Sequence, residues 1–275
     1  MKLTEIKKLA ELDFYTEGPA VGTDGAFYFT TLSGRTVFRI GADGKTEPWA
    51  EGACPNGQAI RADGTHWFCE SRDGRISSHH SDGRFEKVVL DGVCGGVGFS
   101  TPNDLIFDSA GNLYFTDSIR ENGKVFFLGA DGTEKVIADG IDYANGLALS
   151  PSETTLYVAE SYGNRVLAVD LSANAQPRRT VLANLPKHPS NDPVGNLPDG
   201  LATDNEGRIW VAHYGMQAVH IISPGGACVG SFDTGLPLTS NLAFVSDTPR
   251  LKQLLITGGF GEPGPGAVVL ATISL

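Results

Sequence analysis

The stretch NDLIFDSAGNLYFTDS, residues 103–118, decides the fold, because its plan recurs along the chain. A short apolar segment leads into a turn rich in Asp, Gly and Asn, and a second apolar segment with aromatic residues follows. Two such segments with turn residues between them predict a pair of antiparallel β-strands. The first residues, Asn103 and Asp104, place polar side chains at the start of a strand that should be buried, and buried polar groups need partners.

Five other segments follow the same plan. They are EGPAVGTDGAFYFTT (from Glu17), NGQAIRADGTHWFCES (from Asn56), NGLALSPSETTLYVAES (from Asn145), DGLATDNEGRIWVAHY (from Asp199) and NLAFVSDTPRLKQLLITGG (from Asn241). Further hairpins with Asp-Gly turns lie between the copies, for example in residues 34–50, 74–90 and 123–138. Each period of 39 to 54 residues is therefore expected to contain four strands.

Six units of four strands are typical of an all-β fold, the six-bladed β-propeller, in which four-stranded antiparallel blades surround a central channel. After the sixth copy only AVVLATISL, residues 267–275, remains as a third strand. We therefore expect the N-terminal segment, residues 3–15, to supply the missing strand and close the ring. The Pro- and Asn-rich residues 184–198 are interpreted as an extended loop. The prediction is one domain over residues 1–275.

Composition limits the partners of this chain. The formal net charge of −11 would repel nucleic acid and anionic membranes, so a small molecule or a cation is the expected partner. The four cysteines show no C-x-x-C spacing, and the chain opens without the apolar run of a signal peptide. No apolar run is long enough to span a membrane. We expect a cytoplasmic protein, either a monomer or a small homo-oligomer.

Propeller geometry gives the first residue of each copy a common location. In a blade the first strand lines the channel, so its first residue lies at one mouth of that channel. Any one Asn or Asp could simply favour a turn, but six oxygen-bearing side chains in register favour a shared site. Their oxygens suit Ca²⁺, Mg²⁺ or Mn²⁺. The six residues are Glu17, Asn56, Asn103, Asn145, Asp199 and Asn241.

The ends of the second strands should return to the same mouth, because these strands run antiparallel to the first. This rim would carry possible acids, bases and hydroxyl-binding groups around a cation, as a hydrolytic site requires. Each member is also explained as an ordinary pocket wall, a solvated edge or an arginine partner, for example Glu160 with Arg165. The rim residues are Thr31, Glu70, Asp117, Glu160, His213, Tyr214 and Gly258.

Several segments together resemble the regucalcin, gluconolactonase and luciferin-regenerating-enzyme group, in particular its bacterial gluconolactonase-like branch. The matching segments are EGP at 17–19, NG at 56–57, WFCES at 67–71, PNDLIFDSAGNLYFTDS at 102–118, NGLALSP at 145–151 and PDGLATDNEGRIWVA at 198–212. They occur in order and cover most of the chain. The resemblance implies a six-bladed propeller with one divalent cation at the channel mouth and lactonase activity.

The resemblance also assigns roles to residues. It implies that Glu17, Asn145 and Asp199 bind the cation, that Asn103 is a further ligand or holds substrate, and that Asp199 is the catalytic acid–base residue. Ca²⁺ is the expected ion, with Mg²⁺, Mn²⁺, Zn²⁺ and Fe²⁺ as alternatives. The chain departs from the group at Thr101, where regucalcin-type aldonolactonases carry an Arg that engages sugar hydroxyls, and at Ala20, where many members have an aromatic residue.

We therefore predict a metal-dependent hydrolase that opens a sugar-type lactone such as gluconolactone. The predicted substrate-binding residues are Asn103, Glu70, Asp117, Glu160, His213 and Tyr214. Two alternatives use the same mouth: a phosphotriesterase of the fluorophosphatase kind, and a non-catalytic propeller that binds calcium or another ligand. Strand alternation points Asp104 away from Asn103, toward the neighbouring blade.

Overall fold

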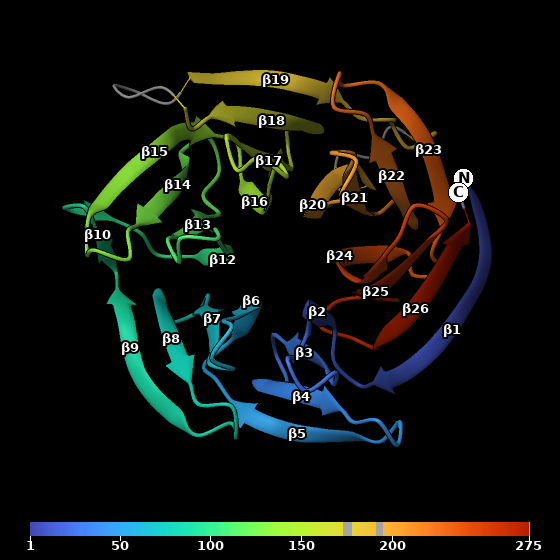
Figure 1. Ribbon diagram of the computed structural model, residues 1–275, viewed down its shortest axis with the longest axis horizontal. Helices are drawn as coiled ribbons and strands as arrows, with labels where there is room; N and C mark the ends of the chain where they lie inside the picture. The colour runs from blue at the N-terminus through green and yellow to red at the C-terminus, as the bar shows by residue number, and fades with distance from the viewer. Residues whose placement is uncertain (173–177, 191–194, 275) are drawn as a thin grey trace.

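The computed structural model describes residues 1–172, 178–190 and 195–274, and within them the chain forms β-strands joined by turns, without an α-helix. The strands form antiparallel sheets arranged in a ring (Figure 1). The predicted all-β, propeller-like fold is confirmed. In the described part of the chain, no helix is long and apolar enough to cross a membrane.

Four sheets contain four consecutive strands each, and in each sheet the chain runs from the centre of the ring outward (Figure 1). The first comprises β2 (Thr16–Val21), β3 (Phe27–Thr31), β4 (Thr36–Ile40) and β5 (Thr46–Glu51). The second comprises β6 (Pro55–Ile60), β7 (His66–Glu70), β8 (Arg75–His79) and β9 (Phe85–Asp91). The third comprises β12 (Pro102–Phe107), β13 (Leu113–Asp117), β14 (Gly123–Leu128) and β15 (Glu134–Ile141). The fourth comprises β16 (Ala144–Leu149), β17 (Thr155–Glu160), β18 (Arg165–Asp170) and β19 (Arg178–Asn184). A short hairpin of β10 (Val93–Cys94) and β11 (Val97–Gly98) separates the second and third sheets.

The last two repeat units form one curled sheet instead of two separate ones. Its strands are β20 (Leu197–Thr203), β21 (Ile209–Tyr214), β22 (Ala218–Ile222), β23 (Cys228–Asp233), β24 (Leu238–Asp247), β25 (Leu251–Gly259), β26 (Gly266–Ser274) and β1 (Lys2–Leu12). Its two halves are joined through the single pair Tyr214–Leu238. The N-terminal strand β1 pairs with the C-terminal strand β26 along its length, from Lys2–Ser274 to Leu12–Gly266.

The expected loop at residues 184–198 is bounded by β19 and β20. Residues 185–190 and 195–196 form no strand, as the Pro and Asn content predicts. Residues 191–194 lie outside the described part.

The aromatic residues of the repeated second strand form the core between neighbouring sheets. Phe29, Phe68 and Phe115 stand two residues before the end of their strands β3, β7 and β13, and all three are fully buried. Phe115, for example, packs in one cluster with Cys69 of the preceding sheet. Burying such a ring contributes roughly 1.5–3 kcal/mol, so the repeated aromatic position explains how neighbouring sheets hold together.

Glycine after the first polar residue of a copy lets adjacent inner strands approach closely. A Cβ atom added to Gly57 would lie 2.2 Å from Asp104 Oδ1, and one added to Gly146 would lie 2.4 Å from the Asp199 carbonyl oxygen. Asp104 therefore packs against the neighbouring inner strand, as strand alternation predicts. In the Asn-Gly pairs, the absence of a Gly side chain lets the next inner strand pack closely at the centre of the ring. This close packing brings the preceding Asn toward the central channel.

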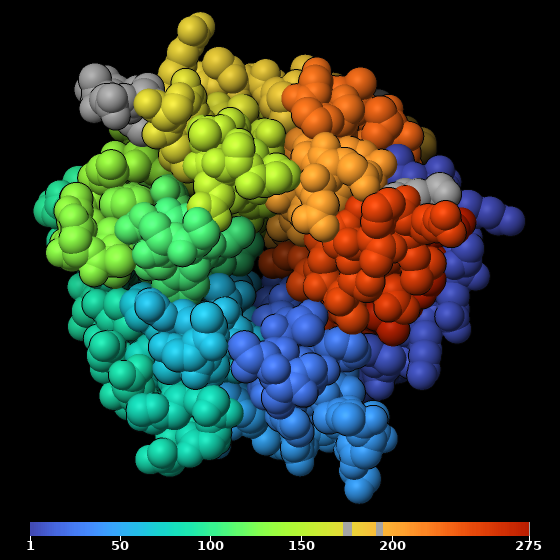
Figure 2. All heavy atoms as spheres, viewed as in Figure 1, coloured from blue at the N-terminus to red at the C-terminus, as the bar shows by residue number. Residues whose placement is uncertain are grey.

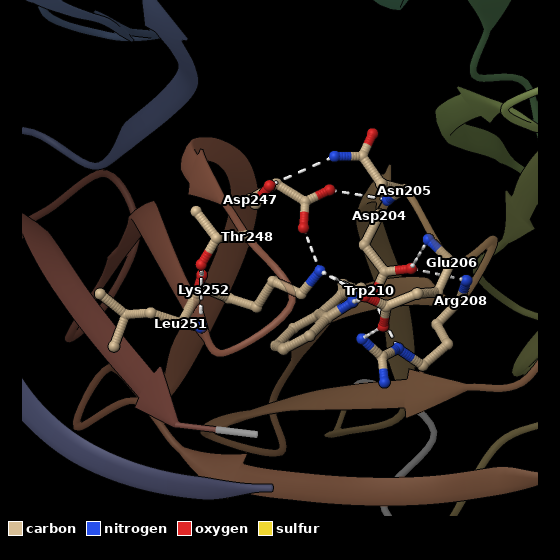
Figure 3. A network of polar contacts seen from close by, with 9 residues as sticks. All are labelled: Asp204, Asn205, Glu206, Arg208, Trp210, Asp247, Thr248, Leu251 and Lys252. Carbon is tan, nitrogen blue, oxygen red and sulfur yellow. Dashed lines mark hydrogen bonds and ion pairs between the residues drawn. The ribbon is translucent and has the colours of Figure 1, made fainter.

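A buried polar network joins the two halves of the curled sheet (Figure 3). Lys252 of β25 is fully buried, and its Nζ lies 3.3 Å from Glu206 Oε1 and also contacts the Asp247 carboxylate. In the β20–β21 turn, Asp204 Oδ2 accepts hydrogen bonds from Trp210 Nε1 at 2.9 Å and from Arg208 Nε at 2.6 Å. Lys252 Nζ lies 3.9 Å from the same Asp204 oxygen. These charges fix β25 to the β20–β21 turn.

Candidate functional site

A cavity of about 270 Å³ lies where the inner strands begin. Its lining includes the first polar residue of five of the repeats, on β2, β6, β12, β16 and β20, and the surface of the ring is hollowed at its centre (Figure 2). These five residues are Glu17, Asn56, Asn103, Asn145 and Asp199. The inner strands thus bring together five of the six side chains that the repeat places on the axis.

The sixth residue, Asn241, does not line this cavity, although its side chain contacts the Glu17 carboxylate. Its side chain lines a second cavity of about 250 Å³, together with Asp104 and Gln58, further along the same inner strands. Its Oδ1 accepts a hydrogen bond from Leu242 N at 2.8 Å. Strand register explains the difference: Leu242 pairs with Ile256 as Leu105 pairs with Phe115, so Asn241 occupies the position of Asp104, one residue after the axis position.

Buried carboxylates dominate the electrostatics of the first cavity. Glu17 and Asp199 are both buried. Burial raises the pKa of Glu17 to about 8, although Gly18 N donates a hydrogen bond to its Oε2 at 2.9 Å. The pKa of Asp199 is raised well above its ordinary value, mainly by burial and secondly by the negative charge of Glu17. Among the described residues, neither carboxylate forms an ion pair with a Lys, Arg or His, so each lacks a positive partner.

The donor set fits a divalent cation. The buried amide oxygens Asn56 Oδ1 and Asn145 Oδ1 accept no hydrogen bond from the residues that the structure describes, while Asn145 Nδ2 donates to Ser161 Oγ at 3.2 Å. In the described part of the chain, no three His, Cys, Asp or Glu side chains are grouped to hold a metal ion. Amides supply the remaining donors here, and two carboxylates with amide oxygens are ligands that Ca²⁺ and Mg²⁺ accept.

Three of the predicted rim carboxylates instead hold the segments that lead into the inner strands. Glu70 Oε2 accepts a hydrogen bond from Cys54 N at 3.2 Å, and Asp117 Oδ1 accepts one from Thr101 N at 2.7 Å. Glu160 Oε1 accepts one from Asp142 N at 2.9 Å, and its other oxygen pairs with Arg165. None of the three lines the cavity. They fix the starts of β6, β12 and β16, and so position the Asn residues that do line it.

Two of the remaining predicted rim residues, His213 and Tyr214, are neighbours in β21, so their side chains lie on opposite faces of the strand. Tyr214 lines the cavity, whereas its neighbour His213 does not. His213 is fully buried, its ring lies 5.1 Å from that of His220, and burial lowers the pKa of His213 to about 3. Thr31 is also buried and donates a hydrogen bond to the Thr36 carbonyl at 2.8 Å. Gly258 accepts a hydrogen bond from Thr16 Oγ1 at 2.9 Å through its carbonyl.

Several lining residues were not predicted. They are Tyr15, Leu32, Tyr143, Ser161, Tyr162, Leu197 and Glu262. Tyr15, Tyr143 and Leu197 each stand two residues before the axis residue of their copy, so alignment of the repeats at that position could have found them. Glu262 lies in the β25–β26 loop, outside the aligned strands, and the repeat gives no signal for it.

The comparison with protein families matches residues 15–259 to the SMP-30/Gluconolactonase/LRE-like region. A gluconolactonase from Zymomonas mobilis is 32% identical over 276 aligned residues, which cover 88% of this chain and 76% of that protein. The lactonase drp35 of Staphylococcus aureus (strain MW2) is 26% identical, covering 92% of this chain and 81% of that protein.

Solved structures agree with the sequence relatives. A gluconolactonase from Xanthomonas campestris superposes with a TM-score of 0.81 at 28% identity, covering 97% of this chain and 88% of that chain. The calcium-binding protein regucalcin from Agrobacterium tumefaciens superposes with a TM-score of 0.74 at 19% identity, covering 97% and 92% of the two chains, a likeness of fold alone.

Proposed function

Because this chain belongs to the SMP-30/Gluconolactonase/LRE-like family, we propose that it is a lactonase that requires one divalent cation. The observation that carries the proposal is the convergence of two buried carboxylates without a positive partner, Glu17 and Asp199, with Asn103 and Asn145 in one cavity. The gluconolactonase and lactonase names of the relatives support lactone hydrolysis as the reaction.

In this proposal Glu17, Asn145 and Asp199 hold the cation, and Asn103 is a fourth ligand or contacts the substrate. When bound, the cation supplies a Lewis acid for the ring carbonyl. Ca²⁺ is the proposed ion because all donors are oxygens, and Mg²⁺, Mn²⁺, Zn²⁺ and Fe²⁺ are the alternatives that metal analysis would distinguish. A sugar-type lactone such as gluconolactone is the proposed substrate.

Asp199 is the proposed acid–base residue. Water attacks the carbonyl carbon, the ring C–O bond breaks, and the proton lost by the water must reach the leaving oxygen. A carboxylate has two oxygen atoms, so one can take this proton while the other remains a ligand. The tyrosines that line the cavity, Tyr15, Tyr143, Tyr162 and Tyr214, would hold the lactone and limit access of bulk water.

We also propose the finer architecture that the repeats predict. The curled sheet is interpreted as two blades, β20–β23 and β24–β26 with β1, because one strand-ladder pair, Tyr214–Leu238, connects the described strands of its two halves. This gives six blades in a single domain over residues 1–275, with the N-terminal strand completing the last blade. The four free cysteines agree with the proposed cytoplasmic location.

Asp199→Asn tests the mechanism, with Asp91→Asn as the matched control, since Asp91 is exposed on the outer strand β9. Proton release from glucono-1,5-lactone and a panel of other lactones would be recorded with the calcium-loaded protein. We expect Asp199→Asn to lower kcat by about 10³-fold or more and the control to match the wild type. Near-normal lactone hydrolysis by Asp199→Asn would overturn the assigned role. If the protein hydrolysed only an organophosphorus fluoridate, it would be a phosphotriesterase instead. If it bound calcium but hydrolysed neither class of substrate, it would be a binding protein.

A further inference from the structure

The cavity has a third carboxylate and no basic side chain. Glu262 lines it together with Glu17 and Asp199, and none of the lining residues is Lys, Arg or His. Residues 173–177, 191–194 and 275, which the structure does not describe, contain no basic residue either. The charge of any cation held by Glu17 and Asp199 is balanced by those two residues. Glu262 then gives the site a net negative charge.

The arginine at the edge of this cavity does not reverse that balance. The Arg120 guanidinium lies 3.6 Å from the ring centroid of Tyr162, which is a lining residue. Arg120 also donates hydrogen bonds to both carboxylate oxygens of Asp142, at 2.7 and 3.4 Å. Its charge is therefore already paired outside the cavity lining.

The structure holds Glu262 in a defined place. Its loop, residues 260–265, is closed by a hydrogen bond from Phe260 N to the Pro265 carbonyl at 2.9 Å. Tyr15 N donates to the Pro263 carbonyl at 2.8 Å, which ties the loop to the segment that carries a lining tyrosine. A Cβ atom added to Gly264 would lie 2.0 Å from the Asp13 carbonyl oxygen, so loop and segment are in close contact.

The electrostatics agree with a carboxylate that faces the same space as the tyrosines. Burial is the main cause of the raised pKa of Tyr15, Tyr143 and Tyr214, and the charges of Asp199 and Glu262 both add to it. The carboxylates of Glu262 and Asp199 therefore lie near the same three tyrosines. Glu262 lines the cavity and is also exposed to solvent.

We propose that Glu262 is a specificity-determining residue that favours lactones with uncharged hydroxyl substituents over lactones carrying a phosphate or a carboxylate. This inference rests on the proposed lactonase function. A carboxylate accepts strong hydrogen bonds from substrate hydroxyls, and it repels an anionic substituent in a site with no basic residue to pair with it. A phosphorylated sugar lactone would have to place its two negative charges beside Glu262 without compensation.

Glu262→Gln tests the proposal because it keeps the size and removes the charge. The matched control is Glu5→Gln, since Glu5 is exposed on the outer strand β1. The ratio of kcat/KM for glucono-1,5-lactone to that for its 6-phosphate would be measured at low and high salt. We expect the wild type to prefer the neutral lactone and Glu262→Gln to reduce the ratio about tenfold at low salt, with a smaller effect at high salt. Glu5→Gln should leave the ratio unchanged.

A binding measurement provides a readout besides turnover. The affinities of 1,5-anhydroglucitol and its 6-phosphate for the calcium-loaded protein, measured by calorimetry, should show the same change in preference. Hydrolysis with an equal ratio in wild type and Glu262→Gln, or a wild type that prefers the phosphorylated lactone, would overturn this inference alone. Absence of lactone hydrolysis in every variant, with the binding preference as expected, would overturn the proposed reaction but support the charge selectivity.

Discussion

Replacing Glu17 by Gln should stabilise the protein when no cation is present and make it less responsive to calcium. The substitution keeps the shape of a buried side chain and removes its charge. Glu17 is buried near Asp199 without a positive partner, so its ionised form is costly in the folded protein. A cation would remove that cost, and the variant would lose a ligand. The effect on stability should therefore depend on whether calcium is present.

The pKa of Glu17 sets the size and the sign of this effect. Burial raises it from an ordinary value of 4.5 to about 8. Because the pKa is higher in the folded state, the stability contributed by protonated Glu17 is present below pH 4.5 and is lost as the pH rises to about 8. At pH 7 the gap of about 2.5 pH units corresponds to about 3 kcal/mol. Without a cation, Glu17→Gln should be more stable than the wild type by about that amount.

Urea unfolding followed by tryptophan fluorescence would measure the difference at pH 7, with a chelator and with calcium. At 100 times its Kd, calcium should stabilise the wild type by about 2.7 kcal/mol and the variant by less, so the advantage of the variant should shrink toward zero. Glu5→Gln, a control on the exposed face of β1, should match the wild type in both conditions. A variant no more stable than the wild type in chelator, or a wild type that calcium does not stabilise, would refute the reasoning.

Two other substitutions separate stability from cation binding. Lys252→Met should destabilise the protein by about 3–5 kcal/mol with or without calcium, because the carboxylates around Lys252 lose a buried positive partner. The control is Lys7→Met, at an exposed position of β1. A loss of less than about 1 kcal/mol for Lys252→Met in urea unfolding would contradict the assigned role. Gly146→Ala should weaken calcium binding at least about tenfold, since the new methyl group would lie 2.4 Å from the Asp199 carbonyl oxygen and displace two ligands. Gly98→Ala, with its nearest contact at 3.7 Å, should bind calcium normally in the same calorimetry, and an unchanged affinity in Gly146→Ala would contradict the packing explanation.

The repeated strand plan predicted most of the architecture. Residues 103–118 form β12 and β13, and the N-terminal segment pairs with the last strand as β1. The same register predicted five side chains of the cavity, because the first residue of an inner strand has one location in a ring of sheets. The joining of the last two units into one curled sheet was not predictable, since it depends on the single ladder pair between Tyr214 and Leu238.

The roles of the predicted rim residues could not be predicted from the sequence alone. Glu70, Asp117 and Glu160 occupy the predicted strand ends, but their carboxylates accept hydrogen bonds from backbone N–H groups. A carboxylate at such a strand end can accept hydrogen bonds either from backbone N–H groups or from a substrate. Only the three-dimensional path of the chain shows which of these it does. Glu262 was missed because a loop outside the repeat brings it to the cavity.

The most direct test of the central claim is a calcium titration of chelator-treated protein in which binding and lactone hydrolysis are measured on the same samples. The proposed site predicts one calcium ion per chain, with hydrolysis of glucono-1,5-lactone or another lactone of the panel rising in proportion to occupancy. Glu17→Gln should shift both curves to higher calcium concentration together. Full hydrolysis in the chelator-treated protein, or binding of calcium that leaves the rate of every lactone unchanged, would contradict the claim.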